Sequence, residues 1–231
     1  MASTPRFHMN SVRNLLTAPT AANGNFPPLL KLTPKADAYK GYVTPYIEIS
    51  VRTNIDSDTD NKGVIAAEIP SEDLLSLFEA VRGAIADKTT GDCTFELKCF
   101  KTIYSKGASP SAPIHISTFK IRRKDGLWAV GLFSTKSERP KIVFEMGAGV
   151  PNKRRYSSFE GTPVNAAMFS EGAMLNWINK VTKHFSDDLE VAMAIALEKD
   201  REKNGDSGRD SAPASARHTA QSTYSEDDLP F

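Results

Sequence analysis

The chain has 231 residues, of which 40% are apolar, so we expect it to bury a core and fold as one large or two small domains. Its 29 Lys and Arg and 28 Asp and Glu give a formal net charge of +1. No run of eighteen apolar residues exists and the first ten residues lack an apolar signal core, so we expect a cytoplasmic protein with no membrane partner.

The N-terminal part combines an irregular arm with strands and one helix. Residues 1–25 are rich in Ser, Thr, Ala and Asn, which predicts an arm that is disordered or ordered only by packing. Three strand patterns follow, at Leu29–Leu32, Tyr46–Val51 and Val64–Ile69. Ser71 is a candidate helix cap, and the apolar spacing after it predicts a helix that ends near Asp87.

A run of strands occupies the middle of the chain. The strand patterns lie at Thr94–Tyr104, Ile114–Arg123, Leu127–Thr135 and Lys141–Met146. Asp125-Gly126 joins the middle two and is typical of a type I′ hairpin turn, so we expect a meander. Cys93 and Cys99 lie too far apart on one extended segment to pair with each other, and two cysteines make no zinc site, so we expect core thiols.

The C-terminal part begins with helices and ends in a polar segment. We expect a helix over about Asn165–His184 and a second one from a Ser186 cap, with a charged end at Glu198–Lys203. From Asn204 the composition turns to Gly, Ser, Ala, Asp and Arg, which predicts a flexible tether over residues 204–231. No internal repeat is visible in the sequence. Residues 26–203 are then the folded part.

The last seven residues place acids beside an apolar ending. These protein-interaction tip residues are Glu226, Asp227, Asp228, Leu229, Pro230 and Phe231, preceded by Ser225. The ring of Phe231 can enter a small pocket while its carboxylate and the acids meet Lys or Arg on the rim. Pro230 limits the entropy lost on docking. A solvated acidic tail is the alternative interpretation.

This ending resembles the acidic tip of bacterial and phage single-stranded DNA-binding proteins, whose tails finish in Asp residues, an apolar residue, Pro and Phe. The helix after Ile69-Pro70, the strand Thr94–Phe100 and the later hairpin are similar to the core of the tailed-phage type. The resemblance implies an oligonucleotide-binding (OB) barrel elaborated with helices, a mainly β fold with α, and a tail that recruits a polymerase, helicase or primase. The chain lacks the long Gln/Gly-rich linker of the bacterial kind, so its oligomeric state stays open.

Charge is segregated along the chain. From Phe95 to Glu160 there are thirteen bases and five acids, a balance of +8, whereas the segment from Asn204 onward carries five acids and two bases, or −3. A basic middle is typical of a segment that contacts nucleic-acid phosphates. We therefore expect single-stranded DNA as the partner of the middle of the chain, with RNA left open.

The hairpin around Asp125-Gly126 supplies the cations and flat surfaces that single strands need. With a two-residue turn, Phe119, Ile121, Val130 and Leu132 share one face, which predicts a core. Lys120, Arg122 and Lys124 then share the opposite face with Ala129, Gly131 and Phe133. This face is the predicted DNA-binding face, and an ordinary solvated strand is the alternative.

Further DNA contacts are predicted around this hairpin. Trp128 and Arg123 are a candidate stacking platform near its tip, although a lone Trp can equally cap the core. A Gly-flanked loop mixes cations with an aromatic side chain and is interpreted as a clamp over the strand. The remaining candidate DNA-binding residues are Lys101, Tyr104, Lys141, Lys153, Arg154, Arg155 and Tyr156.

Three apparent motifs do not support another chemistry. Asp56, Asp58 and Asp60 have the spacing that opens a calcium loop, but Asn61 and Ala67 stand where that loop needs Gly and Glu. A protease-like Gly-Asp-Ser-Gly run at residues 205–208 lies in the tail, and the four histidines are scattered. We expect no metal, no cofactor and no catalytic residue. The rival hypotheses are a nuclease-like enzyme with a recruitment tail and an adaptor that binds only proteins.

Overall fold

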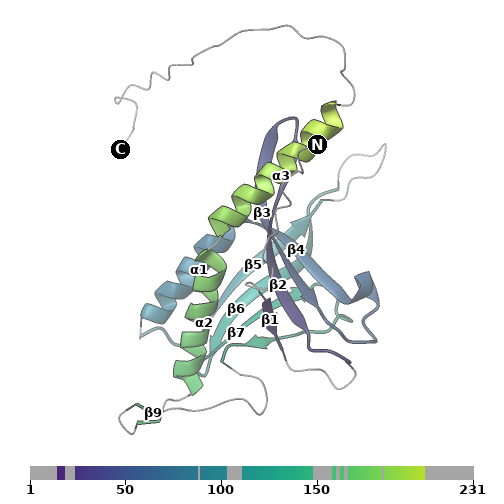
Figure 1. The fold of residues 1–231 in the computed structure, drawn as a ribbon. Coiled ribbons are helices and arrows are strands. Elements are labelled where there is room, and N and C mark those ends of the chain that lie inside the picture. Colours follow the sequence, from purple (N-terminus) through teal and green to yellow (C-terminus); the bar gives the residue numbers. More distant parts are fainter. Residues whose placement is uncertain are drawn as a thin grey trace, which may run out of the picture.

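The computed structural model describes residues 15–18, 24–87, 89–102, 111–147, 158–159, 162–163, 166–183 and 185–205. Within these residues the chain forms two four-stranded antiparallel sheets, a two-stranded pair and three long helices (Figure 1). The fold is therefore mixed α and β. None of the described helices has the length and apolar character needed to cross a membrane.

The first sheet is a meander of β1 (Leu15–Thr17), β2 (Leu29–Tyr39), β3 (Tyr42–Arg52) and β4 (Val64–Pro70). Strands β2 and β3 are longer than predicted and close through Lys40-Gly41, whose φ angles of 51° and 83° suit a type I′ turn. The sequence did not predict this hairpin, because prolines at positions 34 and 45 interrupt its two strand patterns. Within the described residues β1 pairs only with residues 29–31, so no described strand requires a ladder hydrogen bond from Pro34 on that side of β2.

The second sheet is a meander of β5 (Cys93–Lys101), β6 (Ile114–Lys124), β7 (Leu127–Ser134) and β8 (Phe144–Glu145). The predicted hairpin is confirmed: Asp125 and Gly126 have φ angles of 51° and 75°, and Ile121 faces Val130 across the ladder. The predicted last strand, 141–146, is reduced to two residues. Hydrogen-bonded ladders among the described strands run within these two sheets and do not join them into one barrel.

One helix separates the two sheets in the chain and two helices follow the second sheet. They are α1 (Ser71–Ala86), α2 (Ala166–Lys183) and α3 (Phe185–Gly205); a short turn η2 (Asp60–Gly63) and the pair β9 (Ser158–Phe159) and β10 (Thr162–Pro163) complete the elements. Neither predicted cap is confirmed: Ser71 is the first residue of α1, whose N-cap is Pro70, and α3 begins at Phe185, one residue before Ser186. A four-stranded meander followed by a helix occurs twice, a structural repeat that the sequence does not show.

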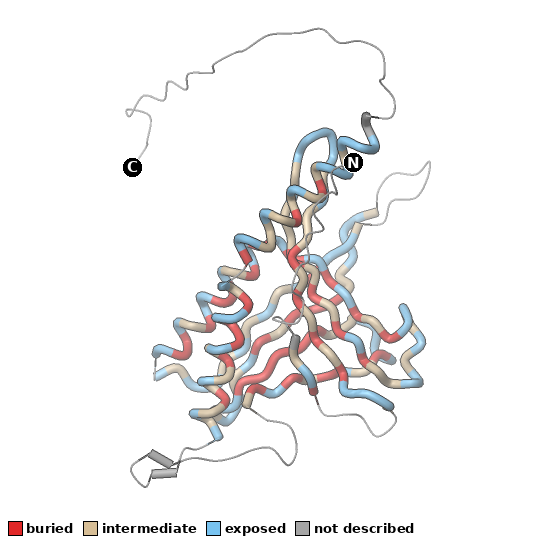
Figure 2. Tube along the Cα trace, viewed as in Figure 1, coloured by how far each residue is buried: buried red, intermediate tan, exposed pale blue. Residues whose placement is uncertain are grey.

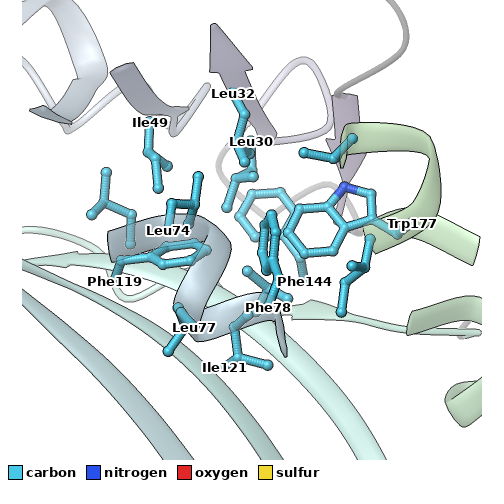
Figure 3. Packing of buried hydrophobic residues seen from close by; sticks show 14 of the residues in the cluster. Leu30, Leu32, Ile49, Leu74, Leu77, Phe78, Phe119, Ile121, Phe144 and Trp177 are labelled. Carbon is cyan, nitrogen blue, oxygen red and sulfur yellow. The ribbon is translucent and has the colours of Figure 1, made fainter. Parts of the chain in front are cut away.

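One apolar cluster joins the inner faces of both sheets to α1 and α2 (Figures 2 and 3). The predicted core face of the β6–β7 hairpin is confirmed, since Phe119, Ile121 and Leu132 are fully buried. Between the helices, Phe78 and Trp177 meet edge to face with ring centroids 5.5 Å apart. Cys99 is buried as predicted, and burial raises the pKa of its thiol.

A buried ion pair connects the loop between β3 and β4 of the first sheet to the loop after β7 of the second sheet. The Arg139 guanidinium, in the loop after β7, donates to Asp58 Oδ2 at 2.8 Å, and both side chains are about 95% buried. Thr53 Oγ1 donates to the same carboxylate at 2.7 Å. Asp60 accepts from Lys136 at 2.8 Å, and this hydrogen bond lowers the pKa of Asp60. Two of the three acids that imitate a calcium loop, Asp58 and Asp60, therefore bind cationic side chains.

This pair generates a stability prediction. Replacing Asp58 by Ala leaves the Arg139 guanidinium buried without its main partner, so the free energy of unfolding should fall by about 3–5 kcal/mol. Asp56→Ala, at an exposed acid on the same loop, is the matched control and should change it by less than about 0.5 kcal/mol. Urea unfolding measures both. Equal losses in the two variants would contradict the role given to the buried pair.

Candidate nucleic-acid interface

Strand register divides the β6–β7 hairpin into an inner and an outer face. Because directly opposed residues share a face, the buried pair Ile121 and Val130 lies inside. Lys120 faces Gly131 and Arg122 faces Ala129 on the outer face, as predicted. The cations are thus carried on the side of the sheet that points away from the core.

A groove of about 490 Å³ lies on this outer face. Its walls carry the predicted cations Lys120, Arg122 and Lys141, and the predicted ring of Phe133 lines it as well. Ala129 and Gly131 form part of its floor. Four of the predicted DNA-binding residues therefore meet in one concave site, although they come from β6, β7 and the loop before β8.

Gly131 gives the groove its flat aromatic surface. A Cβ atom added at Gly131 would lie 2.8 Å from Cε2 of the Phe133 ring and 3.0 Å from the carbonyl oxygen of Ile142. The ring of Phe133 therefore folds back over Gly131, which lies two residues earlier on the same face of β7. Only a residue without a side chain leaves room for a ring lying in this position.

A β-bulge adds a second aromatic position that the sequence did not reveal. The β5–β6 register shifts between Cys99 and Phe100, so that Phe100 faces His115 and Ile116 is the extra residue. The bulge turns His115 toward the groove, where its Nε2 lies 2.9 Å from Thr118 Oγ1. The rings of His115 and Phe100 are 5.3 Å apart, and 56% of Phe100 is exposed. A lone His and a Phe in a strand pattern give no signal of this pairing.

The outer faces of the two sheets differ in charge. On the second sheet they carry five bases and two acids, namely Lys98, Lys120, Arg122, Lys124, Lys141, Glu96 and Glu145. On the first sheet three bases meet three acids, namely Lys31, Lys35, Arg52, Asp37, Glu48 and Glu68. Lys120 binds Glu96 at 2.5 Å. The outer face of the second sheet therefore has a net charge of +3, whereas that of the first sheet is neutral.

The predicted stacking platform of Trp128 and Arg123 is wrong. Trp128 is fully buried, and the Arg123 guanidinium lies over its ring, 5.4 Å from the centroid. Arg123 also donates to the carbonyl oxygen of Gly91 at 2.9 Å and to that of Thr90. Strand alternation places both residues on the inner face with Ile121, so they cap the core and fix the loop after α1.

The remaining predicted contacts lie outside the groove or outside the described residues. Lys124 is exposed at the turn end of β6 and Lys101 is exposed at the end of β5, and neither lines the groove. Tyr104, the loop residues Lys153, Arg154, Arg155 and Tyr156, and the tip Glu226–Phe231 lie outside the residues that the structure describes.

Comparisons with the models of known protein families, with curated proteins and with solved structures found no match. The chemistry of the site therefore has to be inferred from its own residues.

Two aromatic substitutions separate packing from binding. Trp128→Ala should lower the free energy of unfolding by about 3–5 kcal/mol, because it opens a cavity in the core. Phe133→Ala should instead weaken oligonucleotide binding by roughly 1–3 kcal/mol, because it removes a half-buried ring that lines the groove. Thermal unfolding and fluorescence anisotropy measure the two effects. Strong quenching of Trp128 fluorescence on direct contact with a base would contradict its placement in the core.

Proposed function

We propose that the protein binds single-stranded DNA in the groove on the outer face of the second sheet. The observation that carries this proposal is the meeting of Lys120, Arg122 and Lys141 around the ring of Phe133. Binding without sequence preference needs cations for the phosphates and flat side chains on which bases stack. The groove supplies both kinds of group within one cavity.

The aromatic positions favour a single strand over a duplex. A base can stack on Phe133 or on the Phe100–His115 pair only if its own face is free, and in a duplex both faces are covered by neighbouring bases. From Arg122 to His115 the β6 strand spans about 23 Å, at about 3.3 Å per residue. That length matches a strand of several nucleotides and is longer than a single mononucleotide needs.

The wider role that we propose rests on the resemblance of the last seven residues to the acidic tip of single-stranded DNA-binding proteins. In this proposal the protein coats and protects single strands in cytoplasmic replication, recombination and repair, and its tip recruits a polymerase, helicase or primase. The order of β2–β4, α1 and β5–β7 supports the elaborated oligonucleotide-binding barrel as the finer form of the fold. The groove itself needs only the open face of one sheet, so the binding proposal does not depend on barrel closure.

The rival enzyme hypothesis requires acids that hold Mg²⁺ beside the substrate. Two acids lie on the groove's sheet face, and one of them, Glu96, binds Lys120. We therefore propose a binding protein and not a nuclease. Incubation of the protein with labelled single strands and Mg²⁺ decides between them, since the binding protein should leave the strands intact and the nuclease should shorten them.

A salt titration tests the groove. The logarithm of the binding constant for an oligonucleotide should fall with the logarithm of salt concentration by about 0.7 for each phosphate neutralised. Lys120→Gln together with Arg122→Gln should reduce that slope by about 1.4, because two of these contacts are lost. Fluorescence anisotropy at several salt concentrations provides the slopes.

The matched control moves the same charge change to the first sheet. Lys31→Gln together with Arg52→Gln removes two bases from its outer face and should leave the slope unchanged. An equal loss of slope in both double variants would show that general charge, and not the groove, governs binding. Equal affinity for single-stranded and duplex DNA would reject the proposal itself.

A further inference from the structure

A second cavity, of about 370 Å³, lies between α3 and the long β2–β3 hairpin. In Figure 1 the hairpin tip and the C-terminal part of α3 project together beyond the two sheets. Ala192 and Ala196 are buried against the hairpin, which lets the helix approach it closely, and Gly41 N–H donates to Asp200 Oδ2 at 2.9 Å. We call this cavity the α3–hairpin pocket. It is separate from the DNA groove, with which it shares no lining residue.

The pocket combines an apolar floor with cations at its rim. Ala36, Ala38, Ala192, Ile195 and Ala196 supply the apolar surface. Lys199 and Lys203, one helical turn apart on α3, are exposed at the opening. A side chain that enters this pocket meets methyl groups below and ammonium groups beside it.

The acids of the pocket are already occupied, whereas these two lysines are not. Burial and the Asp37 carboxylate, which accepts a hydrogen bond from its hydroxyl, raise the pKa of Tyr46 to about 12. Asp200 accepts the hydrogen bond from Gly41, and Lys35 is paired with Glu48 at 2.5 Å. Among the ion pairs of the described part of the chain, none includes Lys199 or Lys203. Asp37 and Asp200 keep their charge when they accept from neutral donors, so the pocket offers an acidic ligand two lysines outside these ion pairs, beside two carboxylates that are already hydrogen-bonded.

We propose that the α3–hairpin pocket binds the chain's own acidic ending, Asp227–Phe231. The apolar Leu229 and Phe231 match its floor, and the carboxylates of Asp227, Asp228 and the chain end match Lys199 and Lys203. The volume of the pocket suffices for one aromatic ring. Charge and shape thus agree on the same occupant.

The connectivity of the chain favours docking within one molecule. Lys203 lines the pocket and α3 ends two residues later at Gly205, so the remaining chain leaves the fold beside this site. The 26 residues from there to Phe231 span at most about 90 Å when extended, which is more than a return to the pocket needs. A tethered ligand has an effective concentration in the millimolar range, so even a weak pocket is filled.

Docking regulates the tip, and in this respect the inference rests on the proposed recruiting function. A tip held in the pocket is hidden from partner proteins, and a partner must displace it from Lys199 and Lys203. The docking itself involves neither DNA nor the groove. The docking proposal can therefore be wrong while the DNA-binding proposal is right, and the DNA-binding proposal can be wrong while the docking proposal is right.

Amide NMR spectra of the intact ¹⁵N-labelled protein, recorded without DNA, test the docking. Phe231→Ala combined with Asp227→Asn and Asp228→Asn should shift the amide signals of Ala38, Ile195 and Ala196, because the tip leaves the pocket. In a background of Lys199→Gln and Lys203→Gln the same tip change should produce no such shifts. In the control background of Lys180→Gln and Lys183→Gln, two exposed lysines of α2, the shifts should persist.

Three results would overturn the proposal. No shift at the pocket would show that it does not hold the tip, and shifts at Thr118, Gly131 and Phe133 instead would show that the tip occupies the DNA groove. Pocket shifts that disappear on tenfold dilution would show that the tip comes from a second copy. An oligonucleotide titration of the same samples reports on the groove independently.

Discussion

The pairing register of β6 and β7 is the constraint on which the rest of the structure depends. Asp125 and Gly126 both adopt positive φ, so the two-residue turn fixes which residues face each other. A slip by one residue would carry Ile121 and Val130 out of the core and bring Lys120 into it. The same register therefore buries the core on one face of the hairpin and creates the cationic surface on the other.

Neighbouring features turn the flat outer face into a concave site. The loop after β7 carries Lys141 to the groove, and the buried pair of Arg139 with Asp58 anchors this loop to the first sheet. On the opposite side, the bulge at Ile116 brings His115 to the groove beside Thr118. The groove lies on the second sheet alone, and the Arg139–Asp58 pair links the loop that carries Lys141 to the first sheet.

The sequence predicted what strand alternation and turn chemistry determine. It gave the hairpin register, the buried face and the grouping of Lys120 with Arg122. It did not reveal the bulge at Ile116, because a bulge depends on the partner strand and leaves no mark in the pattern of β6. The sequence left stacking and core packing of Trp128 equally open, and the structure places this residue in the core, where strand alternation puts it beside Val130. Contacts such as Arg139 with Asp58 join residues 81 positions apart, beyond the reach of any local pattern.

Photo-cross-linking of a single-stranded oligonucleotide that carries halogenated uracil bases tests the central claim most directly, because the cross-link forms only where a base contacts a side chain. Mass spectrometry of the digested complex then identifies the residue. The account predicts cross-links at Phe133, His115 or Phe100 on the second sheet. Cross-links confined to the exposed Tyr39 and Tyr42 at the tip of the β2–β3 hairpin would contradict it.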